Sequence, residues 1–149
     1  MKKILVVCMG NICRSPTGEA VLRAKAQQLG VEVEIDSAGT IGFHQGNLPD
    51  ERARQAGERR GYSFEGTRSR QVEQRDFSYF DLILAADKDN LHDLKAICPP
   101  QYANKLKLYL SFGNAGQQEI PDPYYGGEQG FELVLDLLED AAEAVLRQR

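Results

Sequence analysis

Apolar residues along the chain fall into two strand-like patterns, short unbroken runs and stretches of strict alternation. The unbroken runs 4–7 and 82–86 predict strands buried on both faces, as in a parallel sheet. The alternating stretches 31–35 and 105–110 predict half-buried strands near the edges of that sheet. Apolar residues at helical spacing occupy the remaining segments, namely 16–29, 50–60, 87–97 and 131–147, with a shorter helix near 72–76.

Several residues mark where these helices begin and end. Gly30 supplies the left-handed residue that often follows a helix, and Gly61 is expected to close the second one. Asp50 and Asp87 precede helical segments, where a carboxylate can accept hydrogen bonds from free backbone amides. The segment 111–130 is rich in Gly, Gln and Pro and is expected to be a long loop.

Strands that alternate with helices predict right-handed crossovers and a parallel sheet that helices cover on both faces. The chain has 149 residues, of which 42% are hydrophobic, enough for one core. We therefore expect residues 1–149 to form a single doubly wound α/β domain. In such sheets ligands bind beyond the carboxyl ends of the strands, where four loops of this chain should converge.

Composition narrows the function. A net charge of −4 argues against a nucleic-acid partner, and the absence of an apolar run near 18 residues argues against a membrane partner. Three cysteines without framework spacing favour the cytoplasm, and two histidines without a paired-ligand motif favour a protein without a metal or other cofactor. The arginines concentrated between residues 52 and 75 fit a solvated surface better than a docking patch.

The stretch 8–16, Cys-Met-Gly-Asn-Ile-Cys-Arg-Ser-Pro, lies between the first strand and the first helix. This order places Cys8 at the mouth of a helix, whose free amides and dipole attract anions and favour a nucleophilic thiolate. Arg14 adds a planar fork that suits two oxygens of a phosphate. Because no Gly-Lys-Ser/Thr follows, the stretch is not a Walker loop. A buried structural cysteine is the plainer alternative.

Within that loop, Gly10 and Asn11 are residue types that tolerate the left-handed backbone of an anion cradle. The hydroxyl of Ser15 is placed where it could donate to the Cys8 sulfur. Far along the chain, Asp122 lies between two prolines that limit its freedom. A carboxyl held over a thiolate could protonate a leaving oxygen and then activate water, although an ordinary Asp-Pro turn is the alternative.

Four motifs together resemble the low-molecular-weight protein tyrosine phosphatases over essentially the whole chain: Cys8-x5-Arg14-Ser15-Pro16, residues 36–40 (Asp-Ser-Ala-Gly-Thr), Asp87, and residues 122–125 (Asp-Pro-Tyr-Tyr). The resemblance implies a central four-stranded parallel sheet and hydrolysis of phosphotyrosine and small aryl phosphates without a metal. It implies Cys8 as the nucleophile, Arg14 as the phosphoryl-binding residue and Asp122 as general acid and base.

The same resemblance implies supporting roles around Cys8. The loop residues that surround the phosphate would be Met9, Gly10, Asn11, Ile12, Cys13 and Ser15. Asn11, with Ser37, would hold the shape of the loop, and Cys13 would trap an oxidised Cys8 as a disulfide. Cys13 as a small apolar filler is the alternative. The implied partners are phosphotyrosine-containing proteins, with a tyrosine kinase as a candidate and the protein a monomer or weakly self-associating.

A phosphotyrosine pocket needs apolar walls, for which Ile12, Phe43, Tyr124 and Tyr125 are the candidates. Phosphoarginine-specific relatives carry Thr in place of Ile12, so this chain resembles the tyrosine-specific type. Two other functions stay open. A thiol-dependent arsenate reductase would need a resolving cysteine, for which Cys98 is the remaining candidate. A phosphotyrosine-binding module without catalysis would need neither Cys8 nor Asp122.

Overall fold

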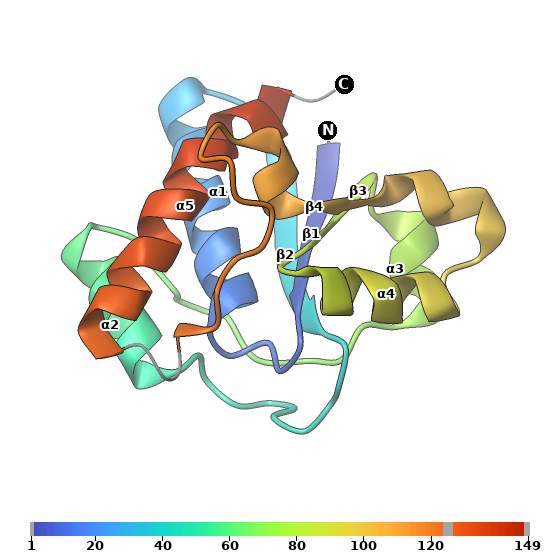
Figure 1. The fold of residues 1–149 in the computed structure, drawn as a ribbon, viewed down its shortest axis with the longest axis horizontal. Helices are drawn as coiled ribbons and strands as arrows, with labels where there is room; N and C mark the ends of the chain where they lie inside the picture. The colour runs from blue at the N-terminus through green and yellow to red at the C-terminus, as the bar shows by residue number, and fades with distance from the viewer. Residues whose placement is uncertain (1, 124–126, 148–149) are drawn as a thin grey trace.

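The computed structural model describes residues 2–123 and 127–147 (Figure 1). Its sheet has four parallel strands in the order β2-β1-β3-β4: β1 (Lys2–Cys8), β2 (Val33–Gly39), β3 (Leu82–Ala85) and β4 (Leu106–Leu108). The helices are α1 (Arg14–Leu29), α2 (Glu51–Arg59), α3 (Gln74–Tyr79), α4 (Lys88–Ile97) and α5 (Gly127–Arg147). Two 3-10 segments, η1 (Pro100–Lys105) and η2 (Tyr109–Phe112), flank β4.

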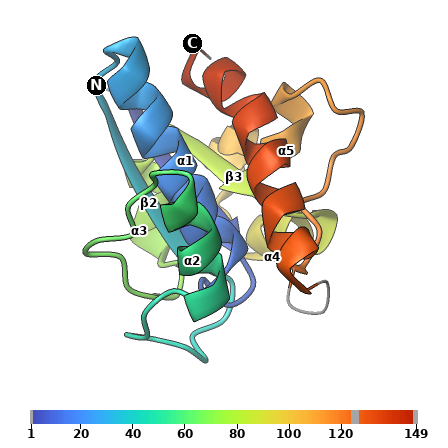
Figure 2. The same cartoon turned by 90° about the vertical axis from the view of Figure 1, so that its left-hand side faces the viewer.

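Helices cover both faces of the sheet, which confirms the predicted doubly wound α/β fold. Figures 1 and 2 show α1, α2 and α5 on one side of the sheet and α3 and α4 on the other. The alternation of side chains along β1 explains this arrangement, because successive residues point to opposite faces. Ile4 and Val6 pack in the cluster with α1 and α5, whereas Leu5 and Val7 pack in the cluster with α3 and α4.

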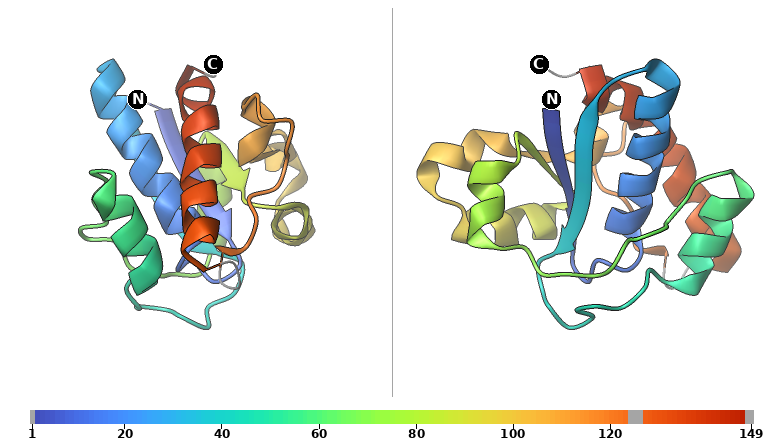
Figure 3. Two further views of the ribbon diagram at one scale, coloured as in Figure 1. Left: turned by 60° about the vertical axis from the view of Figure 1, so that its left-hand side comes forward. Right: turned by 180° about the vertical axis from the view of Figure 1, so that it is seen from behind.

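The central position of β1 determines where the site lies. The chain leaves β1 through α1 to β2 on one side and later places β3 on the other side. The connections on the two sides of β1 therefore run in opposite directions along the sheet. The carboxyl end of β1 is the topological switch point, the place where open parallel sheets bind ligands. Cys8 is the last residue of β1 and pairs with Gly39 at the end of β2. Figure 3 shows the loops after both strands at the same end of the molecule.

Several predicted boundaries were wrong. β2 continues to Gly39 rather than residue 35, because its last residues are buried and no longer alternate. The fourth strand ends at Leu108, and η2 follows with Tyr109 and Leu110 buried. The short predicted helix lies at residues 74–79 rather than 72–76. α5 begins at residue 127 rather than 131, so the predicted loop 111–130 includes its first turn.

Three predicted capping residues are confirmed. The Asp50 carboxylate accepts hydrogen bonds from the amides of Arg52 and Ala53, and Asp87 accepts one from the amide of Asn90. Gly30 follows α1 with a left-handed backbone, at φ 70°. Among residues 2–123 and 127–147, no helix has the length and apolar character needed to cross a membrane.

Replacing Gly30 by alanine tests the left-handed end of α1. No atom lies within 4 Å of the position that a Cβ would take, so any cost comes from the backbone conformation. We expect Gly30→Ala to lower the free energy of unfolding by about 1 kcal/mol, and Gly30→Asn to lower it less. Urea denaturation measures both values. Equal stability of the alanine variant and the wild type would contradict the prediction.

Candidate active site

The loop from Cys8 to Ser15 wraps around the Cys8 sulfur. The thiol is 3% exposed, so it is nearly enclosed. The amide of Asn11 points at the sulfur with N and Sγ 3.3 Å apart, and the Ser15 hydroxyl lies 3.0 Å from it. Hydrogen-bond donors aimed at a sulfur favour its anionic form, which is the nucleophile.

Asn11 gives this loop its shape. With φ at 56°, it is the one residue other than glycine with a positive φ among those that the structure describes. Its side-chain nitrogen Nδ2 donates to the hydroxyls of Ser15 at 2.8 Å and Ser37 at 3.0 Å. Its Oδ1 accepts a hydrogen bond from the amide of Arg70 at 2.9 Å. Three contacts from three parts of the chain therefore hold a backbone conformation that an L-residue disfavours.

The Ser15 hydroxyl links Asn11 to Cys8. Its Oγ accepts from Asn11, and its own proton has two acceptors within reach, the Cys8 sulfur at 3.0 Å and the carbonyl of Ala38 at 3.4 Å. Ser37 in turn donates to the buried carboxylate of Glu19 at 2.7 Å, which also pairs with Arg23. Burial raises the pKa of Glu19, while Ser37 and Arg23 act against that rise.

Arg14, the first residue of α1, is buried and held from two sides. Its Nη1 donates to Asp87 Oδ2 at 2.7 Å and to the carbonyl of Ile120 at 3.0 Å. Burial disfavours the cation, but the hydrogen bond to Asp87 and the negative charges of Cys8, Asp87 and Asp122 together outweigh burial and raise the pKa of Arg14. Arg14 therefore stays a cation, and the two bonds fix the orientation of its guanidinium.

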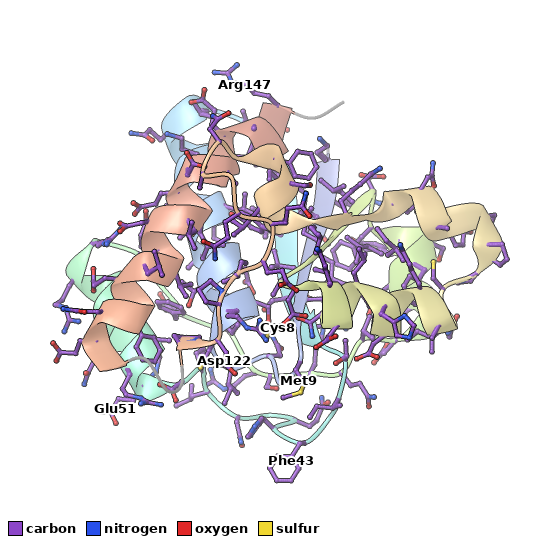
Figure 4. The ribbon with its side chains drawn as sticks, viewed as in Figure 1. Cys8, Met9, Phe43, Glu51, Asp122 and Arg147 are labelled. Carbon is purple, nitrogen blue, oxygen red and sulfur yellow. The ribbon has the colours of Figure 1, made fainter. Side chains whose placement is uncertain are left out.

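Asp122 reaches the same place from a distant part of the chain. The amide of Ile120 donates to the carbonyl of Ala86 at 2.8 Å, and its own carbonyl accepts from Arg14. These bonds anchor the chain two residues before Asp122. Figure 4 shows Asp122 at the end of the molecule that carries Cys8. A pocket of about 330 Å³ joins the three predicted catalytic residues, lined by Cys8, Met9, Gly10, Ile12, Cys13, Arg14, His44 and Asp122.

Of the predicted apolar residues of the pocket wall, Ile12 and Phe43 lie within the described residues, and only Ile12 lines the pocket. Phe43 is 82% exposed and points away from the loop in Figure 4. The ring of His44 lines the pocket instead, with Phe43 packed edge-on against it at 4.9 Å between centroids. The sequence did not single out His44 as a wall because a histidine carries no apolar signal. Tyr124 and Tyr125 lie outside the described residues.

The other two cysteines lie in different surroundings. Cys13 lines the pocket, and burial, with the charge of Asp50 next, raises its pKa to about 12. Cys13 is therefore a neutral thiol at physiological pH. Cys98 packs in the cluster on the face of the sheet opposite to Cys8, and its thiol donates to the carbonyl of Pro99. This placement gives no support to Cys98 as a resolving partner of Cys8.

Comparison with known proteins assigns the family. The family described as low molecular weight phosphotyrosine protein phosphatase matches residues 3–148. The chain belongs to this family. A Synechocystis protein that carries the family's name is 47% identical over 97% of this chain and 94% of its own length. The phosphatase is therefore an enzyme of the protein-tyrosine-phosphatase type, as the resemblance predicted.

Solved structures agree with this assignment. A protein tyrosine phosphatase of Entamoeba histolytica, with Hepes in its active site, superposes with a TM-score of 0.95 at 44% identity, covering 98% of this chain and 95% of that one. Vibrio vulnificus Wzb, solved in complex with benzylphosphonate, superposes with a TM-score of 0.84 at 34% identity, covering 98% and 97%. The four-stranded parallel sheet that the resemblance implied is thus confirmed.

Sequence reasoning missed several residues that support the site. Glu19 and Arg70 carry charges that resemble ordinary surface residues in the sequence, yet both bond to the network around Asn11. Asp87 was identified as a helix cap and motif residue, but its contact with Arg14 depends on the tertiary fold. Most of the arginine-rich segment is exposed, as predicted for Arg52, Arg59, Arg68 and Arg75, but Arg60 and Arg70 are half-buried and each pairs with more than one carboxylate.

Across residues 2–123 and 127–147, no three His, Cys, Asp or Glu side chains form a group that could hold a metal ion. What the site does contain is a cation, an enclosed thiol and a carboxyl around one small pocket. These groups suit the binding of a tetrahedral oxyanion and attack on it by sulfur.

Gly39 offers a test of how closely β2 approaches the loop. A Cβ at this position would lie 2.6 Å from the carbonyl oxygen of Met9 and 3.0 Å from that of Ile41. Because backbone atoms cannot move aside cheaply, Gly39→Ala should displace the loop and lower kcat/KM for an aryl phosphate by about 10²-fold. Steady-state kinetics of the purified variant measures the effect.

The matched control is Gly42→Ala, where a Cβ would meet the tip of the flexible Gln71 side chain at 3.0 Å. This variant should keep kcat/KM within about threefold, because Gln71 can rotate away. Similar losses in the two variants would show that the backbone approach at Gly39 is not what matters.

Proposed function

We propose that the chain hydrolyses phosphotyrosine and small aryl phosphates through a phosphocysteine intermediate on Cys8. The observation that carries the proposal is the single pocket lined by Cys8, Arg14 and Asp122, which are brought together from opposite ends of the sequence. An enclosed sulfur, an oriented guanidinium and a carboxyl cover the three needs of the reaction: a nucleophile, charge stabilisation and proton transfer.

In the first step, the Cys8 thiolate attacks phosphorus opposite the phenolic oxygen. The phosphorus–oxygen bond breaks as Asp122 gives its proton to that oxygen, so the product leaves as a neutral phenol. The guanidinium of Arg14 and the amides of the loop hold the equatorial phosphoryl oxygens. The hydroxyl of Ser15, 3.0 Å from the sulfur, stabilises the thiolate before attack.

In the second step, water attacks the phosphocysteine, and the Asp122 carboxylate accepts a proton from it. The sulfur–phosphorus bond breaks, and inorganic phosphate and the Cys8 thiolate result. The same donor, Ser15, stabilises the sulfur as a leaving group. Asp122 ends the cycle protonated, ready for the next substrate.

The lining of the pocket favours an aromatic leaving group. Ile12 and the faces of the loop supply apolar contacts, and His44 closes one side. The benzylphosphonate complex of the Vibrio vulnificus relative supports a ring-bearing phosphoryl ligand. We propose phosphotyrosine-containing proteins as the substrates, with a tyrosine kinase as a candidate partner and the cytoplasm as the location. Phe43 and residues 124–125 stay candidates for contacts with the ring when a substrate is bound.

Removing the proposed general acid gives the decisive test. Asp122→Ala should lower kcat by roughly 10²–10⁴, the usual contribution of general acid–base catalysis. The loss of kcat/KM, which reports the first step, should be larger for phenyl phosphate than for para-nitrophenyl phosphate, because the more acidic phenol needs less help to leave. Measuring kcat and kcat/KM for both substrates checks the expectation, with Asp93→Ala on the exposed face of α4 as the control.

Cys8→Ser, measured in parallel, should have no detectable turnover and should still bind inorganic phosphate. Turnover by that variant would remove sulfur from the mechanism. An equal loss of kcat/KM for both substrates in Asp122→Ala would remove proton donation to the leaving group.

We also propose that Cys13 protects Cys8 from irreversible oxidation. Peroxide converts Cys8 to a sulfenic acid, which condenses with the Cys13 thiol to form a disulfide and water. Because the pKa of Cys13 is raised to about 12, the fraction present as thiolate, and with it the rate of disulfide formation, should rise between pH 7 and pH 9.

The measurement is the activity recovered with dithiothreitol after a peroxide pulse. The wild type should regain most of its activity, and more after a pulse at pH 9 than at pH 7. Cys13→Ser should regain little at either pH, and Cys98→Ser is the matched control. Full recovery by Cys13→Ser would leave Cys13 as a pocket filler.

A further inference from the structure

An irregular segment, residues 69–72, lies against the loop that holds Cys8. Its amide and carbonyl groups pair with Gly39: the amide of Gly39 donates to the carbonyl of Arg70, and the amide of Val72 donates to the carbonyl of Gly39. The Ser69 hydroxyl donates to the carbonyl of Gly10 at 3.0 Å. The segment thus contacts both the end of β2 and the loop.

The contact of most consequence joins this segment to Asn11. The amide of Arg70 donates to Asn11 Oδ1 at 2.9 Å. This bond sets the rotation of the Asn11 amide, so that its Nδ2 faces Ser15 and Ser37. If the Arg70 amide moved away, the Asn11 side chain would lose its acceptor contact and could turn. Ser15 would then lose the hydrogen bond from Asn11 that helps to hold its hydroxyl beside the sulfur.

Main-chain hydrogen bonds to Gly39 hold the Arg70 backbone, and the side chain of Arg70 adds a second set of contacts. Nη1 and Nη2 donate to the two carboxylate oxygens of Asp76 at 2.9 and 3.2 Å, and Nε donates to Asp36 at 3.2 Å. Asp76 lies on α3 and is 4% exposed, while Asp36 lies on β2. A bidentate bond to a buried carboxylate is among the more rigid contacts that a side chain makes.

Asp76 is itself immobilised. Its Oδ2 also accepts a hydrogen bond from the amide of Glu73 at 2.7 Å, as part of the capping box that starts α3. Asp36 likewise accepts one from the amide of Ser37 at 2.8 Å. The guanidinium is therefore held between a helix terminus and a strand, both of which are regular elements of the fold.

We propose that Arg70 is a positioning residue for the phosphatase reaction, acting through its main-chain amide on Asn11 and through Asn11 on Cys8 and the loop. The guanidinium of Arg70 does not contact the substrate. Its ion pairs with Asp76 and Asp36 help to keep the Arg70 amide within hydrogen-bond distance of Asn11. The inference rests on the proposed function, because it assigns Arg70 to the geometry that binds and attacks the phosphoryl group.

The test compares two arginines that each hold several carboxylates. Arg70→Met keeps the length of the side chain and removes the ion pairs. Arg60→Met removes the ion pairs from the end of α2 to Glu132, Asp136 and Glu139 on α5, without contact with the loop. The partners of Arg60 are more exposed than Asp76, so the free energy of unfolding of both variants is measured by urea denaturation beside their activity.

We expect Arg70→Met to lower kcat for para-nitrophenyl phosphate and to raise the Kd for inorganic phosphate, each by about 10-fold or more, because misplaced groups bind and react less well. Arg70→Lys, which keeps the charge but not the bidentate fork, should fall between. Arg60→Met should keep both values within about twofold. Assays run well below the melting temperature of each variant remove the contribution of unfolded protein.

An NMR measurement keeps the inference testable if turnover is lost for another reason. The backbone amide resonances of Gly10 and Asn11 should shift in Arg70→Met and stay in place in Arg60→Met. Asp36→Asn, at a half-exposed partner, should give a smaller shift in the same direction if Arg70→Met does not fold.

The outcomes separate this inference from the proposed function. If the wild type does not hydrolyse aryl phosphates, the proposed function fails, while the phosphate affinity and resonances still report on Arg70. If the wild type is active and Arg70→Met equals Arg60→Met in kcat, phosphate affinity and loop resonances, Arg70 is an ordinary surface ion pair and the inference is overturned.

Discussion

The left-handed backbone at Asn11 is the constraint on which the site depends. A loop whose amides converge on one point needs at least one residue of this kind, and for an L-residue it costs about 1–2 kcal/mol. Three side-chain hydrogen bonds of Asn11 offset that cost, each contributing about 1 kcal/mol net. Because the partners come from α1, β2 and the segment 69–72, the loop keeps its shape only when the whole sheet is assembled.

The topology of the sheet delivers the remaining groups. The reversal of strand order at β1 leaves the carboxyl end of that strand open between two diverging connections. The chain after η2 returns across this opening and is fixed at Ile120 by the end of β3 and by Arg14. The buried guanidinium of Arg14 is therefore held in one orientation, and its bond to Ile120 also anchors the segment that carries Asp122.

Electrostatic balance in the pocket follows from the same contacts. Asp87 neutralises much of the charge of Arg14, so the cation can be buried without a bound anion. Cys13 stays neutral beside Cys8 because burial and the nearby carboxylate of Asp50 raise its pKa. The pocket thus combines an oriented guanidinium with a neutral Cys13 thiol beside Cys8.

The fold class, the strands and the helix caps could be predicted from local pattern, because buried strands and capped helices depend on residues close in sequence. Cys8, Arg14 and Asp122 could be nominated for the same reason: the strand–loop–helix order and the two prolines are local features. The limits of β2 could not, since the burial of its last residues depends on distant segments.

What only the tertiary structure decided is which charged residues serve the site. Glu19 and Arg70 are indistinguishable in sequence from solvated residues, and the contact of Asp87 with Arg14 could not be read from its role as a helix cap; packing between distant elements brings their partners within hydrogen-bond distance. Phe43 was chosen as a wall for its apolar ring, but the loop after β2 turns that ring to solvent and His44 toward the pocket. Sequence determines the chemistry that the chain carries; packing between distant elements determines which of those groups meet.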